Sequence, residues 1–320
     1  MTRTPALAAR GTAAVILSLA VLGSEPAFAQ ASPSPSPSPS IETEPVRSPV
    51  IDRAPRRVRY LRNAVIRGRL RGGVGGDRVA LQRRGRDGTW RTLARKAVTR
   101  DSNRLRFRLQ DLRRSAAYRL RWQDPGSDRA ASSGPRRIAV RARLRARLSR
   151  RHAIAGRTVR VRGRLRPRAP GRRVLVSKRV DGRWRLVGRP RVRRGRFRTS
   201  VLAGPGGRRP IRVRFRRDAQ NAGARDGKLL RVYRPSLATW YGPGFYGNRT
   251  ACGRILRTTT VGVAHRTLPC GTKVSILYGG RAIRVPVIDR GPYSSARWDL
   301  TSRTAQLIGF SGRNTIGIMR

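Results

Sequence analysis

The sequence predicts an all-β protein in which two tandem antiparallel β-sandwiches precede a distinct C-terminal β domain. Apolar residues alternate with arginine along several stretches, which is the period-two pattern of half-buried strands. The middle of the chain contains an internal repeat. From Ala238 onward, glycine, threonine and aromatic residues replace arginine as the dominant types, which indicates a separate domain.

The N-terminal residues 1–29 have the features of a secretory signal peptide. Arg3 and Arg10 precede an apolar run at 12–22, and Ala27-Phe28-Ala29 has the small-x-small form of a cleavage site. The run is shorter than the roughly 20 residues that span a bilayer, so we expect no transmembrane anchor. No cysteine follows it to carry a lipid. We therefore expect a secreted protein.

Residues 30–55 are expected to form a disordered Ser/Pro-rich linker. A Ser-Pro repeat occupies 31–40, and Pro45, Pro49 and Pro55 follow it. A segment with so many prolines and so few apolar residues cannot bury a core, so we expect an extended spacer.

The two sandwiches are expected at 56–140 and 141–234. Alternating apolar residues and arginines predict strands at 137–141, 159–165 and 211–215. Residues 142–151 have a composition that also suits a helix, and we interpret them as strand or linker.

The internal repeat supports this organisation. Arg67-Gly68-Arg69-Leu70 recurs as Arg162-Gly163-Arg164-Leu165, and Asp87-Gly88 before Trp90 recurs as Asp181-Gly182 before Trp184. Asp-Gly is typical of two-residue hairpin turns. We expect both tryptophans to lie in the cores rather than to stack on sugars. The arrangement resembles the immunoglobulin-like modules that secreted actinobacterial proteins place ahead of wall-active domains.

The net charge of +60, from 75 Lys and Arg against 15 Asp and Glu, implies polyanionic partners. Such a surface concentrates polyanions within a Debye length of about 8–10 Å. Because the chain is expected to be exported, anionic wall polymers replace nucleic acid as the expected partner, and we predict a protein associated with the cell wall. Merely solvated arginine faces and binding to acidic membranes are the alternatives.

Five spaced motifs occur in order within residues 235–320. They are Ala238-Thr239-Trp240-Tyr241-Gly242, Gly247-x-x-Thr250-Ala251-x-Gly253, Ala264-His265-x-x-Leu268-Pro269-x-Gly271-Thr272-x-Val274, Val287-Ile288-Asp289-Arg290-Gly291-Pro292 and Trp298-Asp299-Leu300-Thr301. Together they resemble the rare lipoprotein A (RlpA-like) family, the septal-ring lytic transglycosylases. Expansins, endoglucanase family 45 and membrane-bound lytic transglycosylase A share the domain type. The resemblance covers about a quarter of the chain and implies a six-stranded double-psi β-barrel at 235–320.

The local pattern of this domain is consistent with that fold. Residues 274–278 and 282–288 read as a hairpin around the turn at Gly279-Gly280. Residues 301–308 read as one short helix, with Asp299 or Thr301 near its N-cap and Gly309 at its end.

The resemblance makes Asp289 the general acid/base and places His265 beside the groove. Cleavage of a glycosidic bond needs a carboxylic acid to protonate the departing oxygen. A lytic transglycosylase needs no second carboxylate, because the sugar's own 6-hydroxyl attacks the anomeric carbon and leaves a 1,6-anhydromuramyl end. The implied activity is that of a lyase on peptidoglycan glycan strands. His265 either contacts substrate and shares a proton with Asp289, or is hydrogen-bonded inside the barrel and orients it.

One position departs from the family pattern. Catalytic members carry Glu directly after Thr-Ala-x-Gly, where this chain has Arg254. A cation beside Asp289, from Arg254 or Arg290, would lower the carboxyl pKa and disfavour a general acid. The alternative function is therefore a non-catalytic, expansin-like wall-binding protein. Binding of a muramyl carboxylate is the other role open to the cation at Arg254.

The remaining expectations concern substrate and covalent structure. The expected substrate-binding residues are Trp240, Tyr241, Tyr246, Arg254, Arg290 and Tyr293. Cys252 and Cys270 are the only cysteines and should form a disulfide between two motif loops. His152 and His265 lie too far apart in sequence to form a metal set, so we expect no metal. We also expect no cofactor and a monomeric protein.

Overall fold

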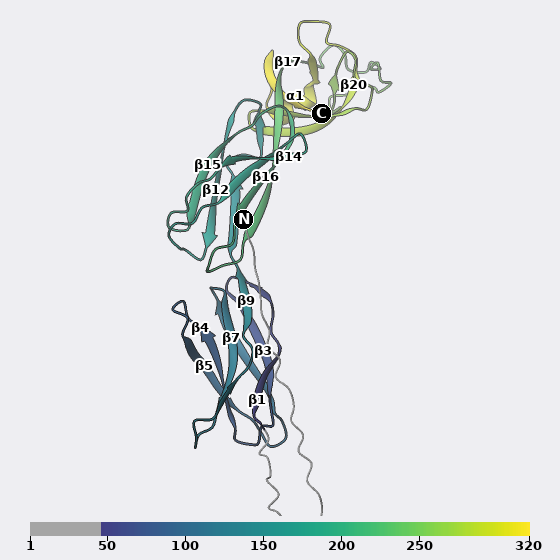
Figure 1. Ribbon diagram of the computed structural model, residues 1–320. Helices are drawn as coiled ribbons and strands as arrows, with labels where there is room; N and C mark the ends of the chain where they lie inside the picture. Colours follow the sequence, from purple (N-terminus) through teal and green to yellow (C-terminus); the bar gives the residue numbers. More distant parts are fainter. Residues whose placement is uncertain (1–45) are drawn as a thin grey trace, which may run out of the picture. The chain divides into compact units, whose positions relative to one another are not determined.

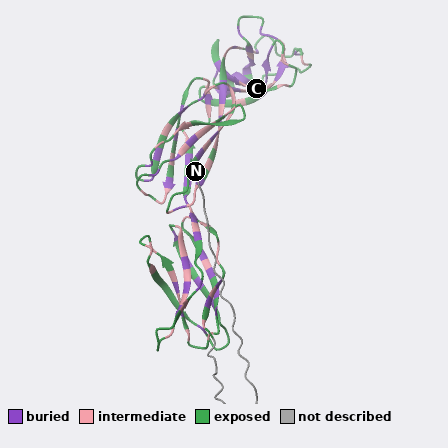
Figure 2. Cartoon of the chain, viewed as in Figure 1, coloured by how far each residue is buried: buried purple, intermediate pink, exposed green. Residues whose placement is uncertain are grey.

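The computed structural model describes residues 46–320 (Figure 1). The predicted signal peptide and residues 30–45 of the predicted linker lie outside the described residues. Three hydrophobic clusters, formed by residues within 51–140, 142–232 and 238–318, line the inner faces of the strands (Figure 2). No helix within 46–320 is long and apolar enough to cross a membrane.

The N-terminal cluster lies between two sheets. One contains β1 (Ser48–Arg53), β3 (Arg62–Arg71) and β6 (Arg104–Leu112). The other contains β2 (Arg57–Arg59), β9 (Arg136–Arg141), β7 (Ala116–Gln123), β4 (Arg78–Arg84) and β5 (Trp90–Ala97), with β8 (Ala130–Ser132) beside β7. Inward residues such as Ile66, Leu70 and Leu120 are fully buried. The alternation thus correctly predicted the strand at 137–141.

The linker prediction is wrong at its C-terminal end. β1 lies within the segment assigned to the spacer and pairs antiparallel with β3. Pro49 and Ile51 are buried there. β1 is an edge strand, where a proline that cannot donate a ladder hydrogen bond is tolerated.

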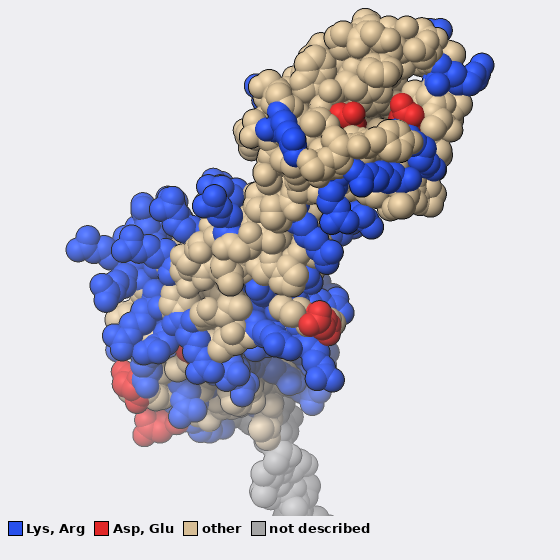
Figure 3. Space-filling view, turned by 90° about the horizontal axis from the view of Figure 1, so that it is seen from above, with Lys and Arg blue, Asp and Glu red and all other residues tan. Residues whose placement is uncertain are grey.

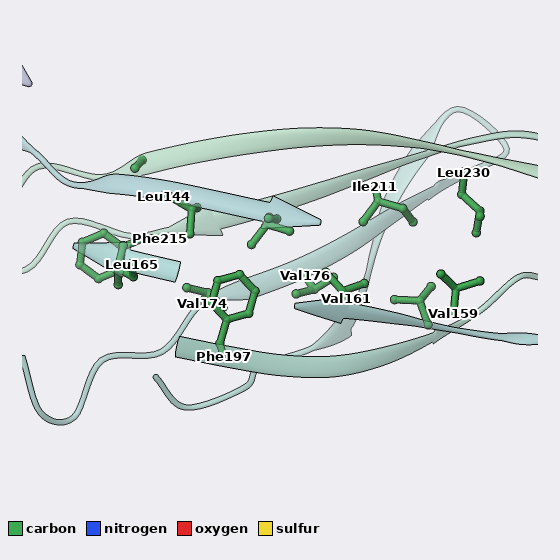
Figure 4. Close-up of a cluster of buried hydrophobic side chains, with 14 of the residues drawn as sticks. Leu144, Val159, Val161, Leu165, Val174, Val176, Phe197, Ile211, Phe215 and Leu230 are labelled. Carbon is green, nitrogen blue, oxygen red and sulfur yellow. The ribbon is translucent and has the colours of Figure 1, made fainter. Parts of the chain in front are cut away.

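The second cluster is also enclosed by two sheets. One contains β10 (Arg143–Leu148), β12 (Thr158–Arg166) and β15 (Arg196–Leu202). The other contains β14 (Arg183–Gly188), β13 (Leu175–Val180), β16 (Gly207–Phe215) and β17 (Ala224–Tyr241), with β11 (His152–Ile154) beside β17. Val159, Val161 and Phe197 on one sheet face Val176 and Ile211 on the other (Figure 4). The predicted strands at 159–165 and 211–215 are confirmed, and the ambiguous segment 142–151 is mainly strand.

The repeated glycines mark a close approach of strands. An added Cβ on Gly163 would lie 2.4 Å from the carbonyl oxygen of Arg145 and 2.2 Å from Phe197. An added Cβ on Gly68 would lie 2.4 Å from the carbonyl oxygen of Val50. The same residue is therefore required at the same place in both copies of the repeat.

The prediction that the repeated tryptophans lie in the cores is wrong. Trp90 is half-buried and Trp184 is 39% exposed, and neither belongs to a core cluster. Each lies under a guanidinium instead: Arg119 stands 4.4 Å from the Trp90 ring and Arg212 stands 4.1 Å from the Trp184 ring. Each pair is a cation–π contact on the sheet surface.

The C-terminal domain is built around the last third of β17. It adds β18 (Val263–Ala264), β19 (Lys273–Tyr278), β20 (Arg281–Asp289), β21 (Trp298–Thr301), α1 (Ser302–Ile308) and β22 (Asn314–Met319). The pairings run β17–β21–β18–β20–β19–β22, and β22 pairs again with β17. The predicted boundary between residues 234 and 235 lies inside β17, so one continuous strand serves both domains.

The local predictions for this domain are largely confirmed. β19 and β20 form the expected antiparallel hairpin. Gly309 ends α1 with a φ of 70°, in the left-handed region that glycine favours. The N-cap is Thr301, whose side chain accepts a hydrogen bond from the Thr304 amide, whereas Asp299 belongs to β21.

Substitution of Gly163 tests the packing of the second sheet pair. Gly163→Ala should lower the free energy of unfolding by about 3 kcal/mol, because the backbone of β10 must move away from the new methyl group. Gly227→Ala is the matched control: Gly227 lies on a strand and an added Cβ meets nothing within 4 Å. Urea denaturation of both variants measures the difference, and equal stabilities would contradict this packing.

Candidate functional site

Asp289 is the last residue of β20, beside the loop that contains the Thr250-Ala251 motif. Its Oδ1 accepts hydrogen bonds from the backbone amides of Ala251, at 2.9 Å, and Arg290, at 2.8 Å. The loop is shaped by a turn in which the Gly253 amide donates to the Thr250 carbonyl. Two backbone donors therefore fix one carboxylate oxygen and leave the other for a further partner.

Asp299 provides a second carboxyl group close to Asp289. Ala264 on β18 pairs with Asp289 of β20 on one side and with Asp299 of β21 on the other. Asp289 and Asp299 are the only acidic residues between 237 and 320. In the C-terminal domain, Figure 3 shows two acidic side chains in a hollow of the surface.

The environment of Asp299 favours its protonated form. Burial raises the pKa of its carboxyl group, and the charge of Asp289 raises it further, whereas a hydrogen bond with Thr239 lowers it. One buried oxygen of Asp299 has no hydrogen-bond partner among residues 46–320. A protonated carboxyl group can donate as well as accept, so Asp299 can hold a proton beside Asp289 at a pH where a solvated aspartate is ionised.

The phenol of Tyr241 completes this polar cluster. Burial raises its pKa, and the charge of Asp289, a hydrogen bond with that carboxyl group and the charge of Asp299 add to the effect, so the hydroxyl remains protonated. Within the described part of the chain, the buried hydroxyl oxygen has no further hydrogen-bond partner. The cluster therefore holds unsatisfied hydrogen-bonding groups, which a bound polar ligand would satisfy.

His265 is buried and is engaged by its own loop. Its Nδ1 accepts from the amides of Thr267 and Leu268, at 3.2 and 3.1 Å, so the ring proton lies on Nε2. The ring packs on Trp298 with centroids 4.4 Å apart. Its backbone amide donates to the Asp289 carbonyl, which ties it to the end of β20. The sequence left two roles open for His265, contact with substrate or orientation of Asp289. These contacts favour orientation of Asp289.

Neither nearby arginine forms an ion pair with Asp289. Arg290 donates from Nη1 to the carbonyls of Leu268, at 2.9 Å, and His265, and from Nη2 to Cys270 Sγ. Its guanidinium is therefore committed to neighbouring loops. Arg254 is exposed, and no ion pair joins its side chain to Asp289 in the described residues.

The predicted sugar-binding aromatics differ in exposure. Tyr293 is 89% exposed, Trp240 is 40% exposed and Tyr246 is 37% exposed, with the Tyr246 hydroxyl 2.7 Å from Ser302 Oγ. Phe245, 55% exposed, stands edge-on to Tyr241. These rings present flat apolar surfaces, which are suited to stacking on sugars.

The predicted disulfide between Cys252 and Cys270 is present. It joins the loop that carries Ala251 to the loop that follows His265, so it links two segments that border Asp289. Closing a loop with a sequence separation of 18 residues should stabilise the domain by about 3 kcal/mol in the chain-entropy model.

The C-terminal domain is similar in sequence to known proteins. Residues 236–319 match the family described as lytic transglycolase. They form a domain of this family. Relatives include a Synechocystis protein named probable endolytic peptidoglycan transglycosylase RlpA, 45% identical over 76 residues, and the Campylobacter jejuni endolytic peptidoglycan transglycosylase RlpA, 39% identical over 82 residues. An Aquifex aeolicus relative is 40% identical over 85 residues.

These matches cover only part of each protein. They span 23%, 25% and 26% of this chain, and 24%, 30% and 36% of the three relatives. A crystal structure of a tetra-tandem repeat in the extending region of a large adhesion protein aligns over 85% of this chain and 74% of its own, with 11% identity and a TM-score of 0.33. A score this low does not show a shared fold.

Asp299 is a site residue that the sequence does not predict. The sequence places Asp299 in the motif Trp298-Asp299-Leu300-Thr301 and near the N-cap of the expected helix, without a role in the site. As a strand, Trp298-Asp299-Leu300 alternates apolar and polar residues, and this alternation is the signal that directs the carboxyl group away from the buried Trp298 and Leu300.

The protonation of His265 gives a pH test of the site. Burial lowers its pKa, and the charges of Arg320, Arg297, Arg290 and Arg266 lower it further. The unfolded chain takes up this proton near pH 6.5 and the folded domain only at lower pH. The stability contributed by the neutral ring is therefore complete above about pH 6.5 and is lost as the pH falls through that value toward the folded pKa.

We expect an NMR titration of the His265 ring to give a midpoint below 6.5, and urea-unfolded chain to give a midpoint near 6.5. His265→Asn should remove the corresponding loss of stability in acid. A midpoint above 6.5 in the folded domain would contradict the described hydrogen bonds.

Proposed function

We propose that this chain is a secreted cell-wall protein whose C-terminal domain, a six-stranded double-psi β-barrel, is an endolytic peptidoglycan lytic transglycosylase. The observation that carries the proposal is the carboxyl group of Asp289, whose Oδ1 accepts two backbone hydrogen bonds and which forms no ion pair with a guanidinium of residues 46–320. The names of the relatives support the same activity for this domain.

In the proposed reaction, Asp289 acts twice. As an acid it protonates the oxygen that links a muramyl residue to the next sugar, and that bond breaks. As a base it then takes the proton of the muramyl 6-hydroxyl, whose oxygen attacks the anomeric carbon and closes a 1,6-anhydro ring. The proton returns to Asp289 and no water is consumed, so one acid/base suffices.

Asp289 must carry a proton for the first step, and the protonated carboxyl group of Asp299 can supply it. Two carboxyl groups close together disfavour the doubly ionised state. Asp299 retains its proton more readily than a solvated aspartate, and Tyr241 remains a neutral donor. The cluster thereby limits negative charge around Asp289, and Tyr241 and Asp299 can donate hydrogen bonds to sugar oxygens.

The surface around the cluster suits a glycan strand. Trp240, Tyr246 and Tyr293 expose rings for sugar faces. Arg254, on the exposed loop of the Thr250 motif, can pair with a muramyl carboxylate instead of with Asp289. The protein would act as a monomer, without metal or cofactor. Because Arg254 replaces the glutamate of catalytic family members, a non-catalytic wall-binding protein is the second candidate.

Digestion of purified sacculi tests the proposal. Wild-type protein should release 1,6-anhydromuramyl products detectable by mass spectrometry, and Asp289→Asn should reduce their rate about 1,000-fold. Asp181→Asn, at an exposed turn of the second β domain, is the control and should retain full activity.

Two results would contradict the proposed enzymatic activity. Wild-type rates in Asp289→Asn would exclude Asp289 as the acid/base. No anhydro products from wild type, even on peptide-stripped glycan, together with equal sacculus binding by wild type and Asp289→Asn, would favour the wall-binding protein.

A further inference from the structure

The sheet formed by β10, β12 and β15 carries an ordered array of arginines on its outer face. Its inward residues, including Leu144, Val161 and Phe197, are buried in the core, so the residues between them point outward. The strand register aligns the outward arginines across the three strands in two complete rows. One row is Arg145, Arg164 and Arg196, and the other is Arg147, Arg162 and Arg198.

This arrangement is unfavourable by itself. Neighbouring strands are about 4.8 Å apart and alternate residues along a strand about 6.8 Å apart, so each charge has several close neighbours of the same sign. Like charges directly opposite each other destabilise a sheet. All six arginines are exposed, and no carboxylate of residues 46–320 forms an ion pair with them. The array therefore lacks the counter-charge that would stabilise it.

The array continues into a concave surface. A cleft of about 700 Å³ begins at Gly195, directly before Arg196, and Gly195 accepts a hydrogen bond from Leu165 of β12. Its exposed arginines are Arg168, Arg173, Arg191, Arg193 and Arg194. A long anion lying along the strands thus meets guanidiniums over the flat sheet and then in the cleft.

The residue type indicates the chemistry of the ligand. A guanidinium presents a planar fork of donors that matches the two non-bridging oxygens of a phosphodiester, as it also matches the two oxygens of a carboxylate, and it carries its charge at every physiological pH. Parallel rows of such forks can bind successive phosphates of a linear chain. The sheet fixes the spacing of the rows at the backbone, whereas the exposed arginine side chains lose rotamer freedom when they bind.

We propose that this arginine array and the adjoining cleft bind a linear wall polymer of phosphodiester-linked polyol units. The choice of a wall polymer rests on the proposed function, whereas the choice of a polyphosphodiester rests on the array alone. Bound there, the polymer neutralises the rows and retains the protein at the wall.

Binding of poly(glycerol phosphate) to the full chain tests this proposal. The triple variant Arg147→Gln, Arg162→Gln, Arg198→Gln removes one row and should weaken binding about 100-fold at low salt. It should also reduce the slope of log affinity against log salt by about 2. The matched control, Arg183→Gln, Arg185→Gln, Arg189→Gln, removes the same charge from exposed positions on and after β14, which belongs to the other sheet. It should change affinity less than 3-fold.

Each other outcome overturns the proposal. Equal losses in both triple variants would indicate attraction by net charge alone. The wild-type protein could instead bind polyglucuronate, duplex DNA or anionic phosphatidylglycerol vesicles more tightly than poly(glycerol phosphate). If the triple variant that removes one row also lost this tighter binding, the array would be assigned to that other ligand. Thermal unfolding verifies that the variants are folded.

Asp289→Asn should bind poly(glycerol phosphate) as wild type does. Failure of the binding proposal is therefore distinguishable from failure of the proposed enzyme, because the array variant should retain cleavage of solubilised glycan.

Discussion

The site depends on the pairing of one short strand with two neighbours. Ala264 of β18 lies between Asp289 of β20 and Asp299 of β21, and this register brings the two acidic residues of the C-terminal domain together. The amides of Ala251 and Arg290 then fix Asp289, while burial keeps a proton on Asp299 to higher pH. A shift of one residue would direct either carboxyl group to the opposite face.

A carboxyl site in so cationic a chain requires that nearby guanidiniums be occupied elsewhere. Arg290, adjacent in sequence, donates to the carbonyls of Leu268 and His265. Arg266 similarly donates to the carbonyls of Pro292 and Ser294. The loops around Asp289 therefore use arginines to satisfy their own carbonyls, which keeps these cations off the carboxylate and rigidifies the surroundings.

Local pattern was sufficient to predict much of the fold. The alternation in β12 and β16, the β19–β20 hairpin and the cap at Gly309 follow from period, turn residues and glycine. The fold predictions are wrong where contacts between distant segments determine the structure. Pro49 and the prolines on either side of β1 conceal this strand in the sequence. The core prediction for Trp90 and Trp184 fails because their partners, Arg119 and Arg212, come from other strands.

The same distinction applies to the site. Asp289 and the disulfide were found because they lie in motifs. Asp299 also lies in a motif, and the alternation around it gives the direction of its carboxyl group, but its proximity to Asp289 arises through β18 and is not visible in the sequence. The direction of Arg290 was likewise open, since the carbonyls that hold it belong to a loop more than twenty residues earlier in the chain.

The most direct test of this account is a carbon-13 NMR titration of the Asp299 carboxyl group in the folded chain, with and without Asp289→Asn. We expect a wild-type midpoint clearly above 3.8, set chiefly by burial, and a lower midpoint in Asp289→Asn because the neighbouring charge is gone. A wild-type midpoint at or below 3.8, unchanged by the substitution, would show that the two carboxyl groups are not coupled and would contradict the proposed site.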